Sequence, residues 1–172
     1  MTGRIELGRL RYCLSREGGL EPIQTEGKEY AAVSIVIVNE SIILEKRASI
    51  EGDPWSSQYS LPGGRYERSD GTLRTTAVRE TMEEVGVDLE EGEYLGFFGP
   101  FSPMNRPGMD VYAHVFRLNS LPIIRRSGEV DEALLVPLMN FNSRDREFIF
   151  DNIRVWGLTA RILNRFCGMI GL

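Results

Sequence analysis

The stretch Leu61–Val87 reads LPGGRYERSDGTLRTTAVRETMEEVGV, and it decides which fold the chain can adopt. Its second half, from about 72 to 85, has the pattern of a helix, and Gly86 supplies the C-terminal stop. Three acids occupy positions i, i+3 and i+4 of this helix: Glu80, Glu83 and Glu84. At about 100° per residue, they project within an arc of roughly 100°. The sequence therefore predicts three carboxylates on one face of a rigid element.

The opposite face of this helix is apolar and is expected to pack into the core. It carries Val78, Met82 and Val85. Like charges as close as the three acids repel one another, at a cost of a few tenths of a kcal/mol per pair on an isolated helix. A hard divalent cation such as Mg²⁺ relieves this repulsion, because it prefers oxygen ligands. Taken alone, the pattern also fits a solvated acidic face.

Two glycines precede the helix and add a second signal. Gly63 and Gly64 have no Cβ, so the backbone there can approach a ligand or metal closely. Joined to the acidic helix at this spacing, they make the stretch resemble the Nudix box. That pattern is Gly, five residues, Glu, seven residues, then REUxEExGU, with U bulky and apolar. The matching positions are Gly64, Arg79-Glu80, Glu83-Glu84, Gly86 and Val87.

The stretch departs from the Nudix box at three points. Asp70 replaces the first glutamate, one residue is added between it and Arg79, and Thr81 occupies a U position. Asp70 can still take the structural role of pairing with the box arginine, Arg79. The aspartate and the added residue are also features of the coenzyme A pyrophosphohydrolase branch of the family.

The resemblance to that branch extends over roughly residues 30 to 165. Ile43–Ala48 resembles its LLTxR(S/A) segment, and Trp156–Arg161 resembles its C-terminal WGxTAR helix. One signature differs, because the coenzyme A motif has an Arg and a Gly in the loop before PGG. Asp53 and Ser57 stand there in this chain, at a spacing longer by one.

The resemblance implies roles for individual residues. Glu80 and Glu84 would bind Mg²⁺ together with the Gly64 carbonyl, and Glu83 would hold a further metal or its waters; Mn²⁺ is an expected substitute. A general base is also needed, and a carboxylate is expected because the chain has a single histidine. The candidates are Glu80 and Glu129, although Glu129 also fits a solvated loop charge. The predicted catalytic residues are thus Glu80, Glu83 and Glu129, and the predicted metal ligands are Gly64, Glu80, Glu83 and Glu84.

Other side chains are candidates for holding the substrate. Arg47 and Arg65 suit a bidentate clamp on phosphate oxygens, or are ordinary surface charges. The Pro- and Gly-rich loop from 99 to 109 forms either a lid for a nucleoside or pantetheine arm, or an ordinary hairpin connection. The predicted substrate-binding residues are Arg47, Arg65, Phe101 and Arg106. His114 alternates with Tyr112 and Phe116 on one strand face, so a core or strand-surface role is expected rather than catalysis.

The remaining patterns place strands and helices around this motif. A hairpin is predicted from 30–38 and 42–44, further strands at 92–98, 110–118 and 133–138, and an amphipathic helix over roughly 152–166. This mixture predicts an α/β domain, and the resemblance implies a Nudix-type α/β/α sandwich around a mixed β-sheet. The prediction is one Nudix hydrolase domain over residues 1–172, with the Nudix box at about 64–87. The N-terminal extension, 1–28, either pairs subunits in a homodimer or covers the sheet edge.

Composition limits the partners. With 25 acidic and 20 basic residues, the net charge of −5 gives no basic field, so nucleic acid is not expected as a partner. The longest apolar stretch, 30–38, is far short of the roughly 20 residues that cross a bilayer, so no membrane span is predicted. No signal peptide is recognised, which leaves a cytoplasmic address as the expectation. Cys13 and Cys167 are expected to be plain thiols.

These observations predict a Mg²⁺-dependent Nudix hydrolase that cleaves the diphosphate linkage of a nucleoside diphosphate derivative, with coenzyme A or a related adenylate first. The alternatives are a nucleoside triphosphate pyrophosphatase, an ADP-ribose pyrophosphatase, and a non-catalytic nucleotide-binding module. The three intact acids argue against the last, because a retired site has no reason to keep mutually repelling charges.

Overall fold

The computed structural model describes residues 5–22, 24–52, 56–141 and 147–172, so Asp53 of the predicted motif loop lies outside the described residues. A mixed sheet of seven strands runs through the described part of the chain, in the order β3-β2-β1-β6-β5, with β4 paired to β1 and β7 paired to β2. The strands are β1 (Glu29–Val38), β2 (Ser41–Arg47), β3 (Tyr59–Ser60), β4 (Gly63–Arg65), β5 (Glu93–Phe101), β6 (Met109–Leu118) and β7 (Val130–Pro137).

The centre of the sheet is the parallel pair β1 and β6, which are in register from Glu29 opposite Met109 to Val38 opposite Leu118. The other strand pairs are antiparallel. Strand β1 is buried along almost its whole length, as its continuous β-branched and apolar sequence predicts for a strand covered on both faces. The predicted hairpin between β1 and β2 is present, and Asn39 in its turn has a φ of 55°.

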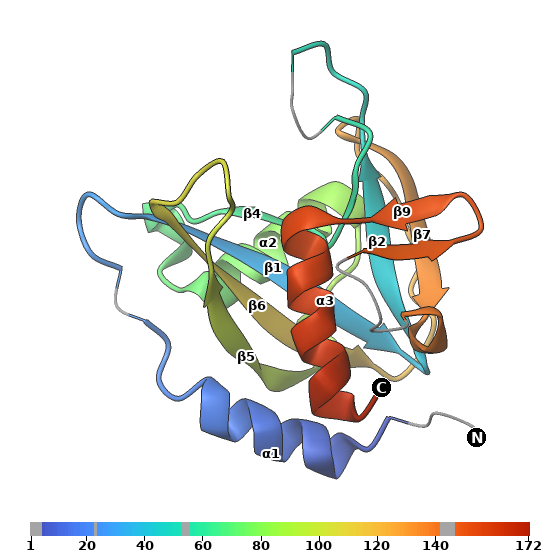
Figure 1. The fold of residues 1–172 in the computed structure, drawn as a ribbon. Coiled ribbons are helices and arrows are strands. Elements are labelled where there is room, and N and C mark those ends of the chain that lie inside the picture. Colours follow the sequence, from blue (N-terminus) through green and yellow to red (C-terminus); the bar gives the residue numbers. More distant parts are fainter. Residues whose placement is uncertain (1–4, 23, 53–55, 142–146) are drawn as a thin grey trace.

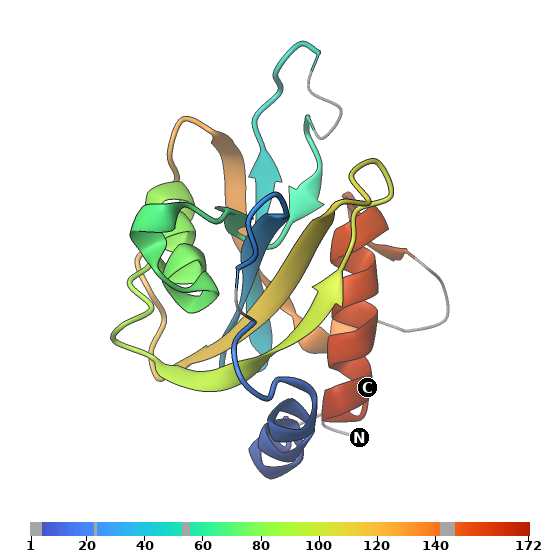
Figure 2. The same ribbon diagram turned by 90° about the vertical axis from the view of Figure 1, so that its left-hand side faces the viewer.

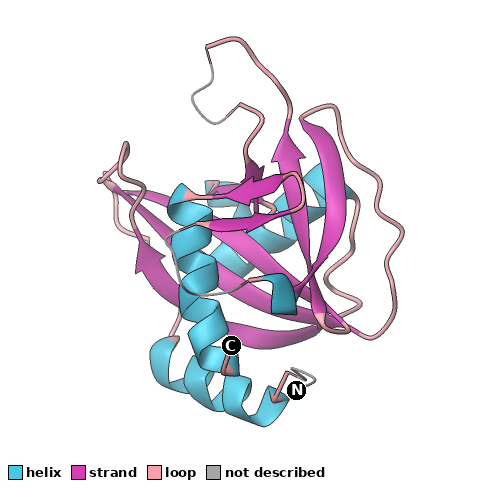
Figure 3. Ribbon diagram, turned by 45° about the vertical axis from the view of Figure 1, so that its right-hand side comes forward, coloured by secondary structure: helices cyan, strands magenta, loops and turns pink. Residues whose placement is uncertain are grey.

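Helices cover both faces of the sheet. Figure 2 shows α2 (Leu73–Val85, green) on one side of the sheet and α3 (Gly157–Ile170, red) on the other, with α1 (Leu7–Glu17, blue) beneath α3. Two 3₁₀ turns, Arg68–Asp70 and Leu138–Asn140, complete the helical elements of the described residues. Figures 1 and 3 show the same layering from other sides. The predicted α/β/α sandwich is therefore confirmed.

Each face of the sheet has its own apolar core. Beneath α2 the buried residues include Val36, Ile43, Leu73, Val85 and Phe116. On the opposite face they include Leu10 and Leu14 of α1, Ile35, Phe98 and Phe166. The residues of β1 alternate between the two cores, which fixes its register.

The C-terminal helix begins later than expected. Residues 152–155 were predicted as its first turn, but Ile153–Val155 forms β9, which pairs with β8 (Phe148–Phe150). The β-branched Ile153 and Val155 favour an extended strand, and Asp151 takes a turn conformation with a φ of 48°. The helix starts at Gly157 and continues to Ile170, four residues beyond the predicted end.

The N-terminal segment contains a helix that the sequence patterns did not predict. Leu10 and Leu14 of α1 are 0% and 2% exposed, and the helix packs against β5 and α3. Since β5 is the last strand in the sheet order, α1 covers this edge of the sheet, one of the two alternatives for the extension. None of the helices in the described ranges is long and apolar enough to cross a membrane.

Candidate active site

The orientation of α2 differs from the prediction. Met82, expected in the core, is 44% exposed, whereas Glu84 is 5% exposed. Small and polar residues allow the carboxylate-bearing side to lie on the sheet: the Thr81 hydroxyl donates to the Ser34 hydroxyl at 2.8 Å, and Ser34 donates to the Ala77 carbonyl at 3.1 Å. The expectation for Met82 was wrong and that for Val85, 0% exposed, is confirmed, because the helix packs through Val85 and through small and hydroxyl-bearing residues such as Ala77 and Thr81.

The two glycines of β4 lie where side chains cannot fit. A Cβ on Gly64 would stand 2.4 Å from the Glu80 carboxyl carbon, and a Cβ on Gly63 would stand 2.3 Å from the Ala32 carbonyl oxygen. The Gly63 amide donates a hydrogen bond to Glu84 Oε2 at 2.8 Å. The glycine pair therefore lets β4 approach β1 on one side and the acids of α2 on the other, whereas the sequence predicted a close approach to a ligand or metal.

Glu84 meets a second buried acid, Glu45 of β2. Glu45 is 1% exposed, and its carboxyl group interacts directly with that of Glu84. Burial, reinforced by repulsion from Glu45, raises the pKa of Glu84. Burial also raises the pKa of Glu45. Two carboxyls this close cannot both ionise cheaply, so they share a proton or balance their charge with a cation.

Arg79 organises the surface side of the acidic helix. Its Nε donates to Asp70 Oδ1 at 2.7 Å and its Nη2 to Asp70 Oδ2 at 3.0 Å, the pairing that the resemblance implied. Its Nη1 donates to Glu80 Oε1 at 2.8 Å and to Glu83 Oε2 at 3.3 Å. The guanidinium thereby fixes the rotamer of Glu80 and partly offsets the repulsion among the acids.

Glu80 and Glu83 occupy different environments. The Glu80 side chain is 16% exposed, and burial raises the pKa of its carboxyl despite the nearby Arg79. The Glu83 side chain is 58% exposed and does not line the cavity described next. The three acids therefore do not converge equally: Glu80 and Glu84 face inward and Glu83 lies at the periphery.

A cavity of about 400 Å³ lies above the glycine pair, and most predicted site residues line it. Its floor holds Gly64, Glu80 and Glu84, and an apolar wall is formed by β6 and α3. Three arginines from separate segments and one loop acid also contribute: Arg47, Arg65, Arg106 and Glu129. Residues that are scattered from 47 to 129 in the sequence are thus brought to one concavity.

Two of the three arginines, Arg65 and Arg106, are held loosely by one acid, Glu29. Glu29 lies 3.9 Å from Arg65 through one carboxylate oxygen and 3.9 Å from Arg106 through the other. All three side chains are exposed by a third or more. Pairs of this kind contribute little to stability, so both guanidinium groups remain able to turn towards an anion in the cavity.

Two residues of the predicted loop lie elsewhere. Phe101 belongs to the end of β5, is 7% exposed, and packs edge-on against Phe98 at 5.7 Å between ring centroids. Met104 is 92% exposed. The cavity is lined from this loop by Pro103 and Arg106 instead.

Several cavity residues were not singled out from the sequence. Leu158, Thr159 and Ile162 of α3 form part of its wall, and Glu45, which does not line the cavity, interacts with Glu84, which does. A signal for Glu45 existed, since an acid that follows Ile43 at a spacing of two faces the same core. Leu158 and Thr159 lie in the stretch that resembles the WGxTAR helix, but the sequence analysis assigned them no role in binding, because the spacing of this helix also fits ordinary packing.

His114 is part of the core, as expected. It is 0% exposed, stacks on Phe97 with ring centroids 5.4 Å apart, and its Nδ1 lies 3.0 Å from the Tyr94 hydroxyl. Burial lowers the pKa of His114 to about 3, so the ring is neutral at physiological pH.

The donor set of the cavity fits a hard divalent cation. Carboxylates at Glu80 and Glu84 and the Gly64 carbonyl region supply oxygen, and Glu45 Oε2 is buried without a hydrogen-bond partner among the described residues. Within the same ranges, no three acidic, His or Cys side chains are gathered as a ready ligand set. Glu80 is engaged by Arg79 and Glu84 by the Gly63 amide.

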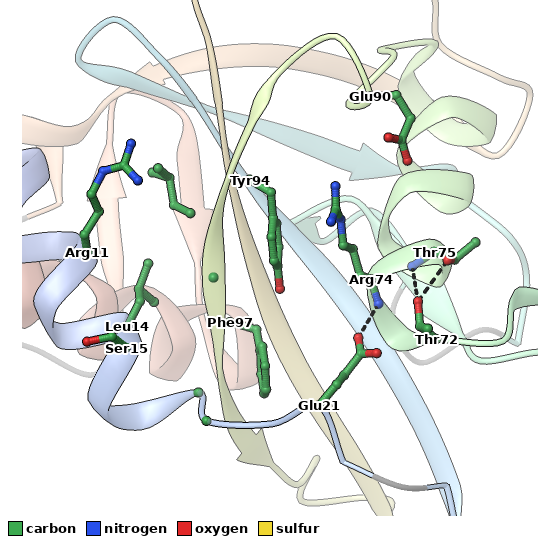
Figure 4. A pocket seen from close by; sticks show the side chains of 14 residues that line it. Arg11, Leu14, Ser15, Glu21, Thr72, Arg74, Thr75, Glu90, Tyr94 and Phe97 are labelled. Carbon is green, nitrogen blue, oxygen red and sulfur yellow. Dashed lines mark hydrogen bonds between the residues drawn. The ribbon is translucent and has the colours of Figure 1, made fainter.

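A second cavity, of about 740 Å³, lies between α1, β5 and the start of α2 (Figure 4). Many of its polar groups are already partnered. The Arg74 amide donates to Glu21 at 2.7 Å, the Arg74 guanidinium lies 4.4 Å from the Tyr94 ring centroid, and Thr72 accepts from the Thr75 amide. These contacts join the N-terminal segment to the sheet and cap α2.

Comparison with known proteins identifies relatives of most of the chain. The model of the NUDIX domain matches residues 28–152. A probable Nudix hydrolase of Schizosaccharomyces pombe is 33% identical over 162 residues, covering 82% of this chain and 56% of the relative. A mitochondrial coenzyme A diphosphatase of Homo sapiens is 31% identical over 121 residues, covering 60% of this chain and 51% of the relative. The chain thus spans about half the length of these two relatives.

Other relatives extend the comparison. An uncharacterised Nudix hydrolase of Pectobacterium atrosepticum is 25% identical and covers 90% of this chain and 88% of its own length. A MutT/Nudix family structure from Enterococcus faecalis superimposes with a TM-score of 0.63 at 16% identity, covering 88% of this chain and 65% of that one. The relatives include mitochondrial and chloroplastic proteins, so the cytoplasmic address stays a prediction.

Proposed function

Because the chain belongs to the Nudix hydrolase family, whose members act on phosphorus anhydrides, we propose that it hydrolyses the diphosphate linkage of a nucleoside diphosphate derivative. One observation carries the proposal: Glu80 and Glu84 line the same cavity as three arginines and an apolar wall. A substrate with adjacent phosphates and a less polar arm has complementary chemistry at each of these surfaces.

The arginines would bind the phosphates. Arg47, Arg65 and Arg106 reach the cavity from β2, β4 and the loop before β6, so they can contact successive phosphate oxygens from different directions. A guanidinium group matches two phosphate oxygens at once, which orients the linkage as well as binding it.

The apolar wall would take the remainder of the substrate. Met109 and Val111 of β6 and Leu158 and Ile162 of α3 line it. An adenosine or pantetheine arm can bury apolar surface there, which favours coenzyme A or a related adenylate over a compact nucleoside triphosphate. The human relative is named a coenzyme A diphosphatase, which agrees with this ranking.

The metal ligands would be the Gly64 carbonyl, Glu80 and Glu84, with Glu83 holding a further ion or its waters. When bound, Mg²⁺ or Mn²⁺ neutralises phosphate charge and lowers the pKa of an attacking water. Arg79 would keep Glu80 in place, through its 2.8 Å hydrogen bond to Glu80 Oε1.

The proton of the attacking water would pass to a carboxylate. Glu129 lines the cavity from the loop before β7, and Glu80 lines it from α2, so these two are the candidate bases. The backbone carbonyl of Glu129 accepts from the Ala48 amide at 2.9 Å, which anchors the loop next to the end of β2.

The test is a parallel assay of coenzyme A, ADP-ribose, NADH and nucleoside triphosphates, with products separated by ion-exchange chromatography. We expect Mg²⁺-dependent turnover with the highest kcat/KM for coenzyme A, loss of turnover in EDTA, and recovery with Mg²⁺ or Mn²⁺. Glu84→Gln should lower kcat by orders of magnitude while the protein stays folded. Nucleotide binding without any turnover would indicate a non-catalytic module, and preferred triphosphate hydrolysis would overturn the substrate ranking.

A further inference from the structure

Strand β2 contains a buried acid for which the Nudix box has no role. Glu45 follows Ile42, Ile43 and Leu44, and like them it is almost fully buried, at 1% exposed. Its Oε2 has no hydrogen-bond partner among the described residues. An unpartnered carboxylate oxygen in the interior is costly, because burial removes its hydrogen bonds to water and no protein group replaces them.

The surroundings of Glu45 make its charge harder to bury. It contacts Glu84, and the charges of Glu80 and Glu129 act on it as well. Arg47 is the nearby positive charge. An apolar side chain of similar volume would fill this space without burying an ionisable group, so packing does not account for a glutamate here.

A divalent cation would provide the partner that the Glu45 Oε2 oxygen lacks among the described residues. Carboxylate oxygen is the ligand type that Mg²⁺ and Mn²⁺ prefer, and a cation between two acids removes their mutual repulsion. We propose that Glu45 is an additional ligand of the divalent cation, and that the cation draws it together with Glu80 and Glu84 into one ligand set. This inference rests on the proposed function, and it adds a ligand from β2 to those of α2 and β4.

The experiment is a titration of the purified, metal-free protein with MnCl₂, followed by calorimetry and by the electron paramagnetic resonance signal of free Mn²⁺. We expect Glu45→Gln to raise the Kd for Mn²⁺ at least tenfold. The matched control is Glu40→Gln, which removes the same charge from the exposed turn at the other end of β2 and should leave the Kd unchanged. No substrate is needed, so the readout is independent of turnover.

Thermal unfolding separates a ligand from a structural residue. Without metal, Glu45→Gln should have the same or a higher Tm than the wild type, since a buried repulsion is lost. With saturating Mn²⁺, its Tm should rise less than that of the wild type. Glu45→Thr provides a second substitution that suits a strand, and the same pattern is expected.

The outcomes distinguish this inference from the proposed function. A wild type that binds no Mn²⁺ would overturn the metal site as a whole. Wild-type binding with an unchanged Kd in both Glu45 variants would overturn only the role of Glu45. Two variants that unfold in the absence of metal would also overturn it, because Glu45 would then serve the fold itself.

Discussion

Arg79 and Asp70 form a bidentate ion pair at the entrance to the acidic helix, with Nε–Oδ1 at 2.7 Å and Nη2–Oδ2 at 3.0 Å. The Asp70 side chain is 3% exposed and that of Arg79 is 23% exposed. Thr76 adds a third hydrogen bond to the Asp70 carboxylate, at 2.8 Å. Burial opposes ionisation of Asp70, and the hydrogen bonds outweigh it, so the pKa of Asp70 is lowered. The pair ties the turn before α2 to the residue that also holds Glu80.

Asp70→Asn should therefore weaken both the fold and the site. We expect the free energy of unfolding to fall by about 2–4 kcal/mol, because a partly buried guanidinium loses the most buried of its ionic partners. Since Arg79 then redistributes its hydrogen bonds to Glu80 and Glu83, kcat should also fall. Urea unfolding and steady-state kinetics measure the two effects.

The matched control for this pair is Glu26→Gln. Glu26 pairs with Arg68 at 3.9 Å, and both side chains are more than 90% exposed, so the change should cost about 0–1 kcal/mol. Equal losses in Asp70→Asn and Glu26→Gln would contradict the structural role of Asp70.

The two glycines of β4 should respond differently to alanine. At Gly64 the new Cβ meets the Glu80 carboxyl at 2.4 Å, and a side chain can move aside, so kcat/KM should fall tenfold or more with little loss of stability. At Gly63 it meets backbone atoms, Ala32 O at 2.3 Å and Val33 Cα at 2.6 Å. Moving strand β1 should cost about 1–3 kcal/mol or more, as measured by urea unfolding.

Gly108→Ala is the control for both glycine variants, because a Cβ there has nothing within 4 Å. It should change neither stability nor turnover measurably. A Gly64→Ala enzyme with wild-type kcat/KM would show that the close approach to Glu80 is not needed for the reaction.

The motif revealed the helix and the glycine pair, but not how the helix is turned. The spacing correctly predicted three acids on one side of the helix. The distribution of apolar residues, however, predicted that Met82 would face the core. The outcome was decided by hydrogen bonds from Thr81 and Ser34, which a hydrophobicity pattern does not contain. Spacing along the helix also could not reveal Glu45, because its contact with Glu84 depends on the register between β2 and the rest of the sheet.

Local patterns also predicted most of the strands, and they failed at the two ends of the chain. In α1 the two fully buried residues, Leu10 and Leu14, share one face, an amphipathic signal that the sequence analysis did not use, and this face packs on β5 and α3. At 152–155 the apolar spacing suited a helix, but the short β8–β9 pairing stabilises an extended chain instead. In both regions, partners distant in the sequence decide the local conformation.

Glu29 and Arg106 should affect substrate binding in opposite directions. Glu29 lies 3.9 Å from both Arg106 and Arg65, so it competes with substrate phosphates. Glu29→Gln should lower KM by about two- to threefold, in keeping with the small energy of exposed ion pairs. Arg106→Ala should raise KM about tenfold, since a hydrogen bond to a charged group contributes about 1.5 kcal/mol or more.

The control for these charge changes is Arg154→Ala, because Arg154 lies on β9 and pairs with Glu147 at 2.9 Å. Its KM should match that of the wild type at each salt concentration. A rise of KM in Arg154→Ala as large as that in Arg106→Ala would mean that net charge, rather than the position of Arg106 at the cavity, controls substrate binding.

His114 should make folding stability depend on pH. Burial lowers the pKa of its imidazole to about 3, whereas the unfolded chain has an ordinary value near 6.5. Below about pH 6.5 the unfolded state binds a proton that the folded state excludes, so stability falls as the pH falls. Between pH 7 and pH 5 the loss should be about 2 kcal/mol.

The measurement compares urea unfolding of the wild type and His114→Phe at pH 7 and pH 5. Since the chain has a single histidine, the variant has no histidine to titrate between the two pH values. The carboxyl groups titrate in both proteins, so their effect cancels in the comparison. Phenylalanine keeps the stacking on Phe97 but loses the hydrogen bond with Tyr94, so the variant is expected to be less stable at pH 7. The decisive quantity is the loss in free energy of unfolding between pH 7 and pH 5. If the wild type loses no more than His114→Phe, the folded state accepts the proton on His114.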